Sequence, residues 1–280
     1  MANIIDGKLV ASAVKTELAA MTKDLIETKG IIPGLAVVCV GDNPASQVYV
    51  KNKCKACEEI GYRSVKHMLP TTTTEQDLLL LISELNANPD IHGILVQMPL
   101  PSHINEKVIM RAIKPSKDVD AFHPENVGRI VSNDYLFAPC TPAGIMTLLE
   151  YYGIDVAGKE CVIVGRSDIV GKPLALLMTH ANGTVTVCHS RTADLARVCS
   201  RADILVVAIG RAKFITADYV KPGAIVIDVG INRTAEGKLC GDVDFESVAS
   251  IAAYITPVPG GVGPMTIAML MKNTYTAATL

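Results

Sequence analysis

The amino-acid sequence predicts an α/β protein of two βαβ lobes with a cleft between them, the second lobe being a Rossmann-type doubly wound parallel sheet. Two observations carry this prediction. Short apolar runs rich in Val and Ile alternate with longer amphipathic stretches, and the runs lack the polar alternation of half-exposed strands. One run ends in a glycine turn that opens a helix, an arrangement typical of nucleotide-binding βα units.

The expected strands are, in order, Leu35–Val40, Ser64–Leu69, Gly93–Gln97, Cys161–Val164, Val185–Cys188, Ile204–Ala208 and Ala224–Val229. The expected helices, each an amphipathic stretch, are Gly7–Thr28, Ala45–Ile60, Glu75–Asn86, Pro142–Tyr151, Val170–His180 and Met265–Thr276. Strands separated by helices indicate parallel sheets, because parallel neighbours need a crossover connection.

A domain boundary is expected where prolines interrupt the chain around residues 138–143. There Thr141 is placed as a helix N-cap, followed by Pro142 at the first helical position. The first lobe therefore covers residues 1–139 and the second, cofactor-binding lobe residues 140–263. The C-terminal helix, about residues 264–280, is expected to return to the first lobe.

Composition excludes several classes of function. The net charge is −2 with no basic block, and aromatic residues make up 4% with no Trp, so nucleic acid and anionic membranes are not expected partners. Asp6 and Lys8 interrupt the apolar stretch that a signal peptide needs, which predicts a cytoplasmic protein. The eight cysteines are scattered, and the single CxxC of Cys54 and Cys57 has no second pair, so we expect free thiols and no metal.

The run ending in Gly165 reads as strand, glycine turn and helix. Gly165 permits a tight turn, and Gly171 permits close approach of the helix to the sheet. Ser167 stands where the dinucleotide-binding fingerprint has a further glycine, so an ordinary βα turn stays an alternative.

The end of the next strand carries Ser190 and Arg191, where an NAD enzyme would place an acid for the ribose. A hydroxyl and a guanidinium suit the 2′-phosphate of NADP, and the alternative is a solvated arginine. Ile231, after the fourth strand of this lobe, is expected to face the same crevice.

A second constellation lies in the first lobe. Tyr49 and Lys53 are four residues apart on one face of an expected helix, and Gln97 ends an apolar strand before prolines break it. Ligands bind at the carboxyl ends of parallel strands, so Gln97 is a candidate for a site. Asp120 lies in a loop rich in carboxylates, whose alternative role is a turn or a helix cap.

Together the motifs resemble the bifunctional methylenetetrahydrofolate dehydrogenase/methenyltetrahydrofolate cyclohydrolase family. The segments that carry the resemblance are, in order, GDNPASQVYVKNK, GILVQMPLP, PSKDVDAFHPENVGR, PCTPAGIMTLL, VIVGRSDIVGKPLA, TVTVCHSRT, VIDVGINR and TPVPGGVGPMTIAMLM. They span residues 41–271, nearly the whole chain. The resemblance implies NADP-dependent oxidation of 5,10-methylenetetrahydrofolate, hydrolysis of the methenyl product to 10-formyltetrahydrofolate, and a homodimer whose ligands are tetrahydrofolate derivatives.

The resemblance also implies roles for individual residues. Tyr49 stacks on or orients the substrate, Lys53 transfers protons, Gln97 holds the Lys53 amine and Asp120 accepts hydrogen bonds from the pterin. The substrate-binding residues that it implies are Tyr49, Lys53, Val96, Gln97, Met98, Asp120, Pro259, Gly260, Gly261, Val262 and Gly263. The implied cofactor-binding residues are Gly165, Arg166, Ser167, Ser190, Arg191 and Ile231.

The chain departs from the family pattern at two of these segments. Ala121 stands where the family usually has Gly, which matters if that backbone needs a positive φ angle, and Met98 replaces a common Leu. Two alternative functions stay open: a monofunctional NAD(P)-dependent methylenetetrahydrofolate dehydrogenase, and a non-catalytic NADP-sensing module. The retained Tyr49, Lys53 and Gln97 argue against the monofunctional enzyme.

Overall fold

The computed structural model describes residues 1–234 and 237–280, which form two compact units. One unit comprises Met1–Ala11 and Thr141–Thr266, and the other comprises Ser12–Cys140 and Ile267–Leu280. The chain passes between them within the helices α1 (Gly7–Lys29) and α10 (Val262–Ala278) and at the start of α6 (Cys140–Tyr151).

The unit containing Thr141–Thr266 is built on a six-stranded parallel sheet in the order β1-β11-β8-β7-β5-β6. Its strands are β1 (Asn3–Ile4), β5 (Glu160–Val164), β6 (Thr184–Cys188), β7 (Ile204–Val207), β8 (Ile225–Asp228) and β11 (Tyr254–Ile255). Counted from β5 along the chain, the order is 2-1-3-4-5, one of the two common doubly wound orders. The Rossmann-type prediction is confirmed, with β1 as an additional edge strand.

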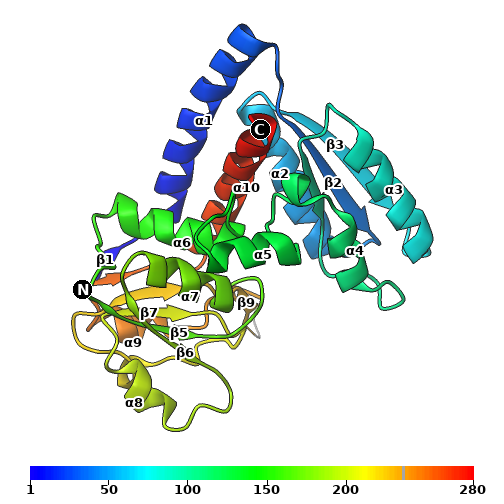
Figure 1. The fold of residues 1–280 in the computed structure, drawn as a ribbon. Coiled ribbons are helices and arrows are strands. Elements are labelled where there is room, and N and C mark those ends of the chain that lie inside the picture. Colours follow the sequence, from blue (N-terminus) through cyan, green and yellow to red (C-terminus); the bar gives the residue numbers. More distant parts are fainter. Residues whose placement is uncertain (235–236) are drawn as a thin grey trace. The chain divides into compact units, whose positions relative to one another are not determined.

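Helices cover this sheet and bury its apolar strands. They are α6, α7 (Gly171–His180), α8 (Leu195–Cys199) and α9 (Phe245–Ala249), with a 3₁₀ turn at Ala217–Tyr219 and a small antiparallel pair, β9 (Asn232–Arg233) and β10 (Leu239–Cys240). Helix α7 packs against β5 and β6 (Figure 1). Strands β5 and β7 are almost entirely buried, as expected for strands that are covered on both faces.

The other unit contains a three-stranded parallel sheet in the order β3-β2-β4 (Figure 1). Its strands are β2 (Gly34–Val40), β3 (Arg63–Leu69) and β4 (Gly93–Val96), and its helices are α2 (Pro44–Glu59), α3 (Glu75–Ala87), α4 (Glu106–Ala112) and α5 (Pro124–Val131), with a 3₁₀ turn at Pro115–Lys117. The central strand β2 is buried along its whole length, and α2 packs against β2 and β3. Helix α3 begins at a capping box between Thr74 and Asp77.

All seven expected strands and all six expected helices are present, with ends shifted by at most a few residues. The sequence prediction missed the two-residue strands and the short helices α4, α5, α8 and α9. It also placed residues 1–139 in one lobe, whereas the first eleven residues join the Thr141–Thr266 unit, because Asn3 and Ile4 pair with Tyr254 and Ile255 of β11. In the described ranges, no helix combines the length and apolarity needed to cross a membrane.

Candidate functional site

The best-defined candidate site lies where α2 approaches the end of β4. The Asn43 side chain accepts a hydrogen bond from the Ser46 backbone N–H (3.2 Å) at the start of α2, and Tyr49 and Lys53 follow one turn apart on this helix. The Lys53 Nζ donates to Gln97 Oε1 at 2.9 Å. This contact joins the two residues that the sequence predicted to act together.

The orientation of the Gln97 side chain is set by its second hydrogen bond. Its Nε2 donates to the carbonyl of Met98 at 2.8 Å, so its oxygen is left to face Lys53. Lys53 is only 9% exposed, whereas Tyr49 is 42% exposed. The pair therefore combines a nearly buried amine with an accessible aromatic ring one helical turn away.

Asp120 lies within the electrostatic reach of Lys53. Burial raises the pKa of the Asp120 carboxyl above its ordinary value, and the positive charge of Lys53 acts in the opposite direction. The Cys140 Sγ lies 3.7 Å from Asp120 Oδ1. The structure thus brings together Lys53, Gln97 and Asp120 within one unit, with Tyr49 beside them on α2.

The loop that carries Asp120 is held at both ends. The buried Asp118 carboxylate accepts hydrogen bonds from the His123 N–H (2.7 Å) and from Asn126 Nδ2 (2.9 Å), and Asn273 Nδ2 donates to the Val119 carbonyl at 2.8 Å. Ala121 has φ +57°, so the positive φ that the usual glycine would supply is indeed required here.

The remaining predicted folate residues differ in their surroundings. Val96 is buried in the core of the same unit, and Met98 is half-buried beside Gln97. The segment Pro259–Gly263 belongs to the other unit, where the Lys8 backbone N–H donates to the Gly260 carbonyl at 3.2 Å. Predicted substrate-binding residues are thus distributed over both units.

The two glycines of the turn after β5 lie directly against backbone atoms of the same unit. Gly165 has φ +131°, and a Cβ added there would lie 2.3 Å from the Ala208 carbonyl oxygen. A Cβ on Gly171 would lie 2.1 Å from the Gly165 carbonyl oxygen. Both predicted glycine roles, the tight turn and the close helix approach, are confirmed by these distances.

Ser167 has a structural role in this turn. Its Oγ accepts hydrogen bonds from the backbone N–H groups of Val170 (3.2 Å) and Gly171 (3.4 Å), which caps the start of α7. This explains why a serine rather than a glycine suits the position.

The predicted cofactor-selecting side chains are exposed. Ser190 and Arg191 follow β6, where the Arg191 backbone N–H donates to His189 Nδ1 at 3.2 Å. Within residues 1–234 and 237–280, neither Arg166 nor Arg191 forms an ion pair, so both guanidinium groups are available to an anion. Ile231 is half exposed after β8.

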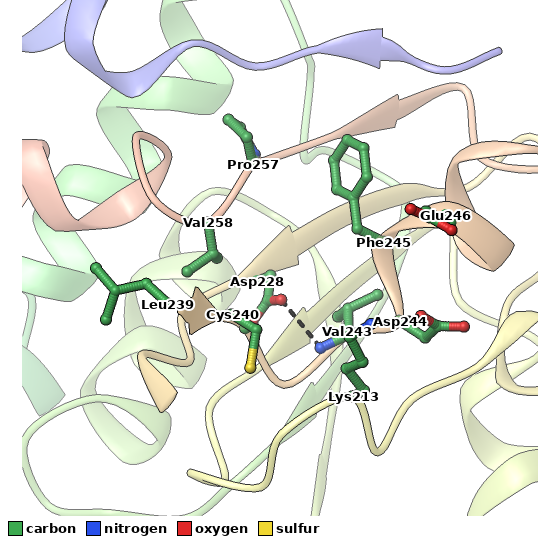
Figure 2. A pocket seen from close by; sticks show the side chains of 11 residues that line it. Lys213, Asp228, Leu239, Cys240, Val243, Asp244, Phe245, Glu246, Pro257 and Val258 are labelled. Carbon is green, nitrogen blue, oxygen red and sulfur yellow. Dashed lines mark hydrogen bonds and ion pairs between the residues drawn. The ribbon is translucent and has the colours of Figure 1, made fainter. Parts of the chain in front are cut away.

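The sequence reasoning placed the strand end at Asp228 beside the cofactor crevice, but it assigned no role to the buried carboxylates of Asp228 and Asp242. Asp228 is 4% exposed and Asp242 is fully buried. Burial raises the pKa of Asp228 to about 6 against the opposing effect of three backbone N–H donors. Asp228 borders a pocket of about 240 Å³ that Val243 and Cys240 also line (Figure 2). The one sequence signal for Asp228 is its position, an acidic residue at the end of an apolar strand.

Comparison with known proteins identifies the family to which the two parts of the chain are similar. Residues 5–120 match the catalytic domain of the tetrahydrofolate dehydrogenase/cyclohydrolase family, and residues 139–280 match its NAD(P)-binding domain. The chain is 58% identical over 278 residues to the bifunctional protein FolD of Streptococcus pneumoniae serotype 4, covering 99% of this chain and 98% of that protein. It is 60% identical over 273 residues to the FolD of Agathobacter rectalis, with 98% of each covered.

Solved structures agree with the sequence relatives. A bifunctional FolD methylenetetrahydrofolate dehydrogenase/cyclohydrolase from Campylobacter jejuni superposes with a TM-score of 0.97 at 51% identity, covering 100% of this chain and 99% of that one. A FolD from Trypanosoma brucei, complexed with NADP cofactor and inhibitor, has a TM-score of 0.95 at 40% identity, with coverage of 99% and 97%.

Proposed function

Because the chain belongs to the tetrahydrofolate dehydrogenase/cyclohydrolase family, we propose that it catalyses two consecutive reactions of one-carbon folate metabolism. The first is the NADP-dependent oxidation of 5,10-methylenetetrahydrofolate to 5,10-methenyltetrahydrofolate. The second is the hydrolysis of that product to 10-formyltetrahydrofolate. The observation that carries the second activity, and that favours it over a monofunctional dehydrogenase, is the 2.9 Å contact between Lys53 and Gln97.

In the hydrolysis, Lys53 is the proton-transfer residue. Its Nζ accepts a proton from the water that attacks the methenyl carbon, and it returns a proton to N5 as the carbon–N5 bond breaks. One water is consumed and one proton is released overall. The Gln97 oxygen holds the Nζ in place, because its amide nitrogen is already bonded to the Met98 carbonyl.

Asp120 binds the pterin ring. A half-buried carboxylate with a raised pKa gains from the N–H donors of the amino-pyrimidinone edge, because these hydrogen bonds stabilise its charged form. The exposed ring of Tyr49 offers a face on which the flat substrate can stack.

The Thr141–Thr266 unit fits a dinucleotide. Gly165 and Gly171 leave no room for a Cβ where α7 meets the turn, so the start of α7 lies close against the end of β5, as in nucleotide-binding βα units. The exposed side chains of Ser190 and Arg191 suit a 2′-phosphate, with Arg166 and Ile231 bordering the same strand ends. When bound, NADP⁺ accepts the hydride from the methylene carbon.

We also propose that the unit of Ser12–Cys140 and Ile267–Leu280 carries the folate chemistry, with Pro259–Gly263 touching the substrate. We propose a homodimer on the basis of the family resemblance, and a cytoplasmic location on the basis of the free thiols. Six of the eight cysteines are buried free thiols, which are typical of a reducing compartment.

The test is turnover of 5,10-methylenetetrahydrofolate, followed at the absorbance of the methenyl product, with NADP⁺ and NAD⁺ in parallel. Hydrolysis of supplied methenyltetrahydrofolate is measured separately. We expect both activities and a preference for NADP⁺. Oxidation without hydrolysis would indicate the monofunctional dehydrogenase, and NADP binding without either activity would indicate a sensing module.

A further inference from the structure

Asp242 is a fully buried residue whose carboxylate accepts hydrogen bonds from four donors. Its Oδ2 accepts hydrogen bonds from the backbone N–H groups of Ile209 (2.7 Å) and Gly210 (3.0 Å). Its Oδ1 accepts from the backbone N–H of Arg211 (2.7 Å) and from the Asn232 side chain (2.8 Å). One side chain thus binds three consecutive residues beyond β7 and one residue beyond β8.

Asp228, the last residue of β8, extends this arrangement, and Figure 2 shows its hydrogen bond from the Val243 backbone N–H. Its Oδ1 accepts from the backbone N–H groups of Gly230 (3.0 Å) and Asp242 (2.9 Å), and its Oδ2 accepts from Val243 (2.9 Å). Its own backbone N–H donates to Thr256 Oγ1 at 2.7 Å. Asp228 therefore fixes the segment that carries Asp242.

Two glycines make room for the carboxylates. A Cβ added to Gly230 would lie 2.3 Å from Cγ of Asp242, and one added to Gly241 would lie 1.7 Å from Oδ2 of Asp228. Neither carboxylate forms an ion pair with a residue that the structure describes. Burying a charge without a counter-ion is costly, so the backbone donors are what keep these groups in place.

The anchored segments lie where a ligand of this fold binds. In a doubly wound sheet of order 2-1-3-4-5, the crevice is outside the carboxyl ends of the strands, at the switch point between β5 and β7. The backbone groups bonded to Asp242 belong to the turn after β7, one of the two switch-point strands, and Asn232 follows β8, the neighbour of β7. The Ala208 carbonyl, which comes just before them, faces the Gly165 turn.

The hydrogen bonds to Asp242 also fix the direction of the peptide groups in the turn after β7. When the N–H groups of residues 209–211 point to Asp242, the trans peptide geometry turns the carbonyls of residues 208–210 away from it. The Asp242 carboxylate therefore decides which groups the turn after β7 presents to the strand ends.

We propose that Asp242 is a positioning residue for the dehydrogenase reaction, whose carboxylate holds the turns after β7 and β8 in the shape that binds NADP⁺. This inference rests on the proposed function. Asp242 touches neither reactant and acts through Ile209, Gly210, Arg211 and Asn232. Because the proposed hydrolysis needs no cofactor, the two activities of one protein separate a positioning role from a general structural role.

The decisive variant is Asp242→Asn, which keeps the size of the side chain but places an NH₂ group against backbone donors. The matched control is Asp244→Asn, two residues away, whose carboxylate forms a 3.9 Å ion pair with Lys213. We measure KM for NADP⁺, direct NADP⁺ titration, kcat for oxidation, and kcat/KM for hydrolysis of supplied methenyltetrahydrofolate, all on the full chain.

We expect Asp242→Asn to raise KM and the dissociation constant for NADP⁺ at least tenfold, with hydrolysis within twofold of wild type and Asp244→Asn unchanged. Parallel loss of both activities, or an unchanged KM for NADP⁺, would overturn the proposal. If Asp242→Asn does not fold, Asn232→Ala decides: a two- to fivefold rise in that KM supports the proposal, and no rise refutes it. A wild type without NADP⁺-dependent turnover would overturn the proposed function, and this inference with it.

Discussion

Gly171 offers a sharp test of how α7 is joined to the sheet. A Cβ at this position would lie 2.1 Å from the Gly165 carbonyl oxygen, 2.7 Å from its carbonyl carbon and 3.1 Å from Cα of Arg166. All three neighbours are backbone atoms, which cannot rotate away as a flexible side chain would. Replacing Gly171 by Ala therefore forces either the helix start or the glycine turn to move.

The expected cost follows from two opposing effects. Overpacking costs about 1–3 kcal/mol, and Ala in place of Gly within a helix recovers about 0.5–1 kcal/mol. The net loss of about 1–2 kcal/mol corresponds to a fall in Tm of roughly 2–8 °C for a protein of this size. Cofactor affinity should fall about tenfold or more, since small displacements of positioning groups are costly.

Gly128 supplies the matched control, because it lies inside α5 and an added Cβ would meet nothing within 4 Å. Gly128→Ala should stabilise the protein by about 0.5–1 kcal/mol and leave cofactor binding unchanged. The two variants are compared by thermal unfolding and by NADP⁺ titration. A Gly171→Ala protein with the Tm and affinity of Gly128→Ala would refute the reasoning from the close approach.

Three further outcomes are expected. Lys53→Met should lower hydrolysis of supplied methenyl substrate by about 10²-fold or more, the usual scale for an acid–base group, and near-wild-type hydrolysis would remove Lys53 from that role. Arg191→Ala should reduce the ratio of kcat/KM for NADP⁺ to that for NAD⁺ by roughly one to two decades, from the loss of about 1.5–3 kcal/mol in charge-assisted bonds; an unchanged ratio would mark Arg191 as a solvated surface charge. Burial raises the pKa of Asp228 from 3.8 to about 6, so the folded state holds this proton more tightly than the unfolded state. This stabilisation is about 3 kcal/mol below both pKa values and is lost as the pH rises through the folded pKa, so the free energy of unfolding should fall by about 2 kcal/mol between pH 4 and pH 6. Asp228→Asn should remove that part of the pH dependence, as measured by chemical denaturation at several pH values. A free energy of unfolding that falls with pH in the variant as it does in the wild type would contradict the prediction.

The central strands and the glycine turn could be predicted from the sequence, because their signals are local. A buried run such as Val162–Val164 followed by Gly165 carries its own evidence of a strand and a tight turn. The Lys53–Gln97 contact was also within reach, because helical spacing and a strand end each limit where a side chain can lie.

Other features depend on contacts between distant parts of the chain. Strand β1 has only two residues and exists because Asn3 and Ile4 meet β11, some 250 positions later. The role of Asp242 has the same origin: its carboxylate reaches backbone groups that precede it by 31–33 positions, and its sequence surroundings read as an ordinary turn. No periodicity or motif within a short window reports such pairings.

Ala121 shows how a local signal and its distant compensation combine. Because Ala121 replaces the usual glycine, the sequence raised the possibility of a positive φ angle at this residue. The observed φ of +57° strains an alanine by about 1–3 kcal/mol. The loop holds this conformation because the buried Asp118 carboxylate accepts hydrogen bonds from the His123 N–H and from Asn126, while Asn273 donates to the Val119 carbonyl. These contacts on both sides of Asp120 keep the loop in the shape that presents its carboxylate, so the departure from the family pattern leaves the proposed pterin anchor in place.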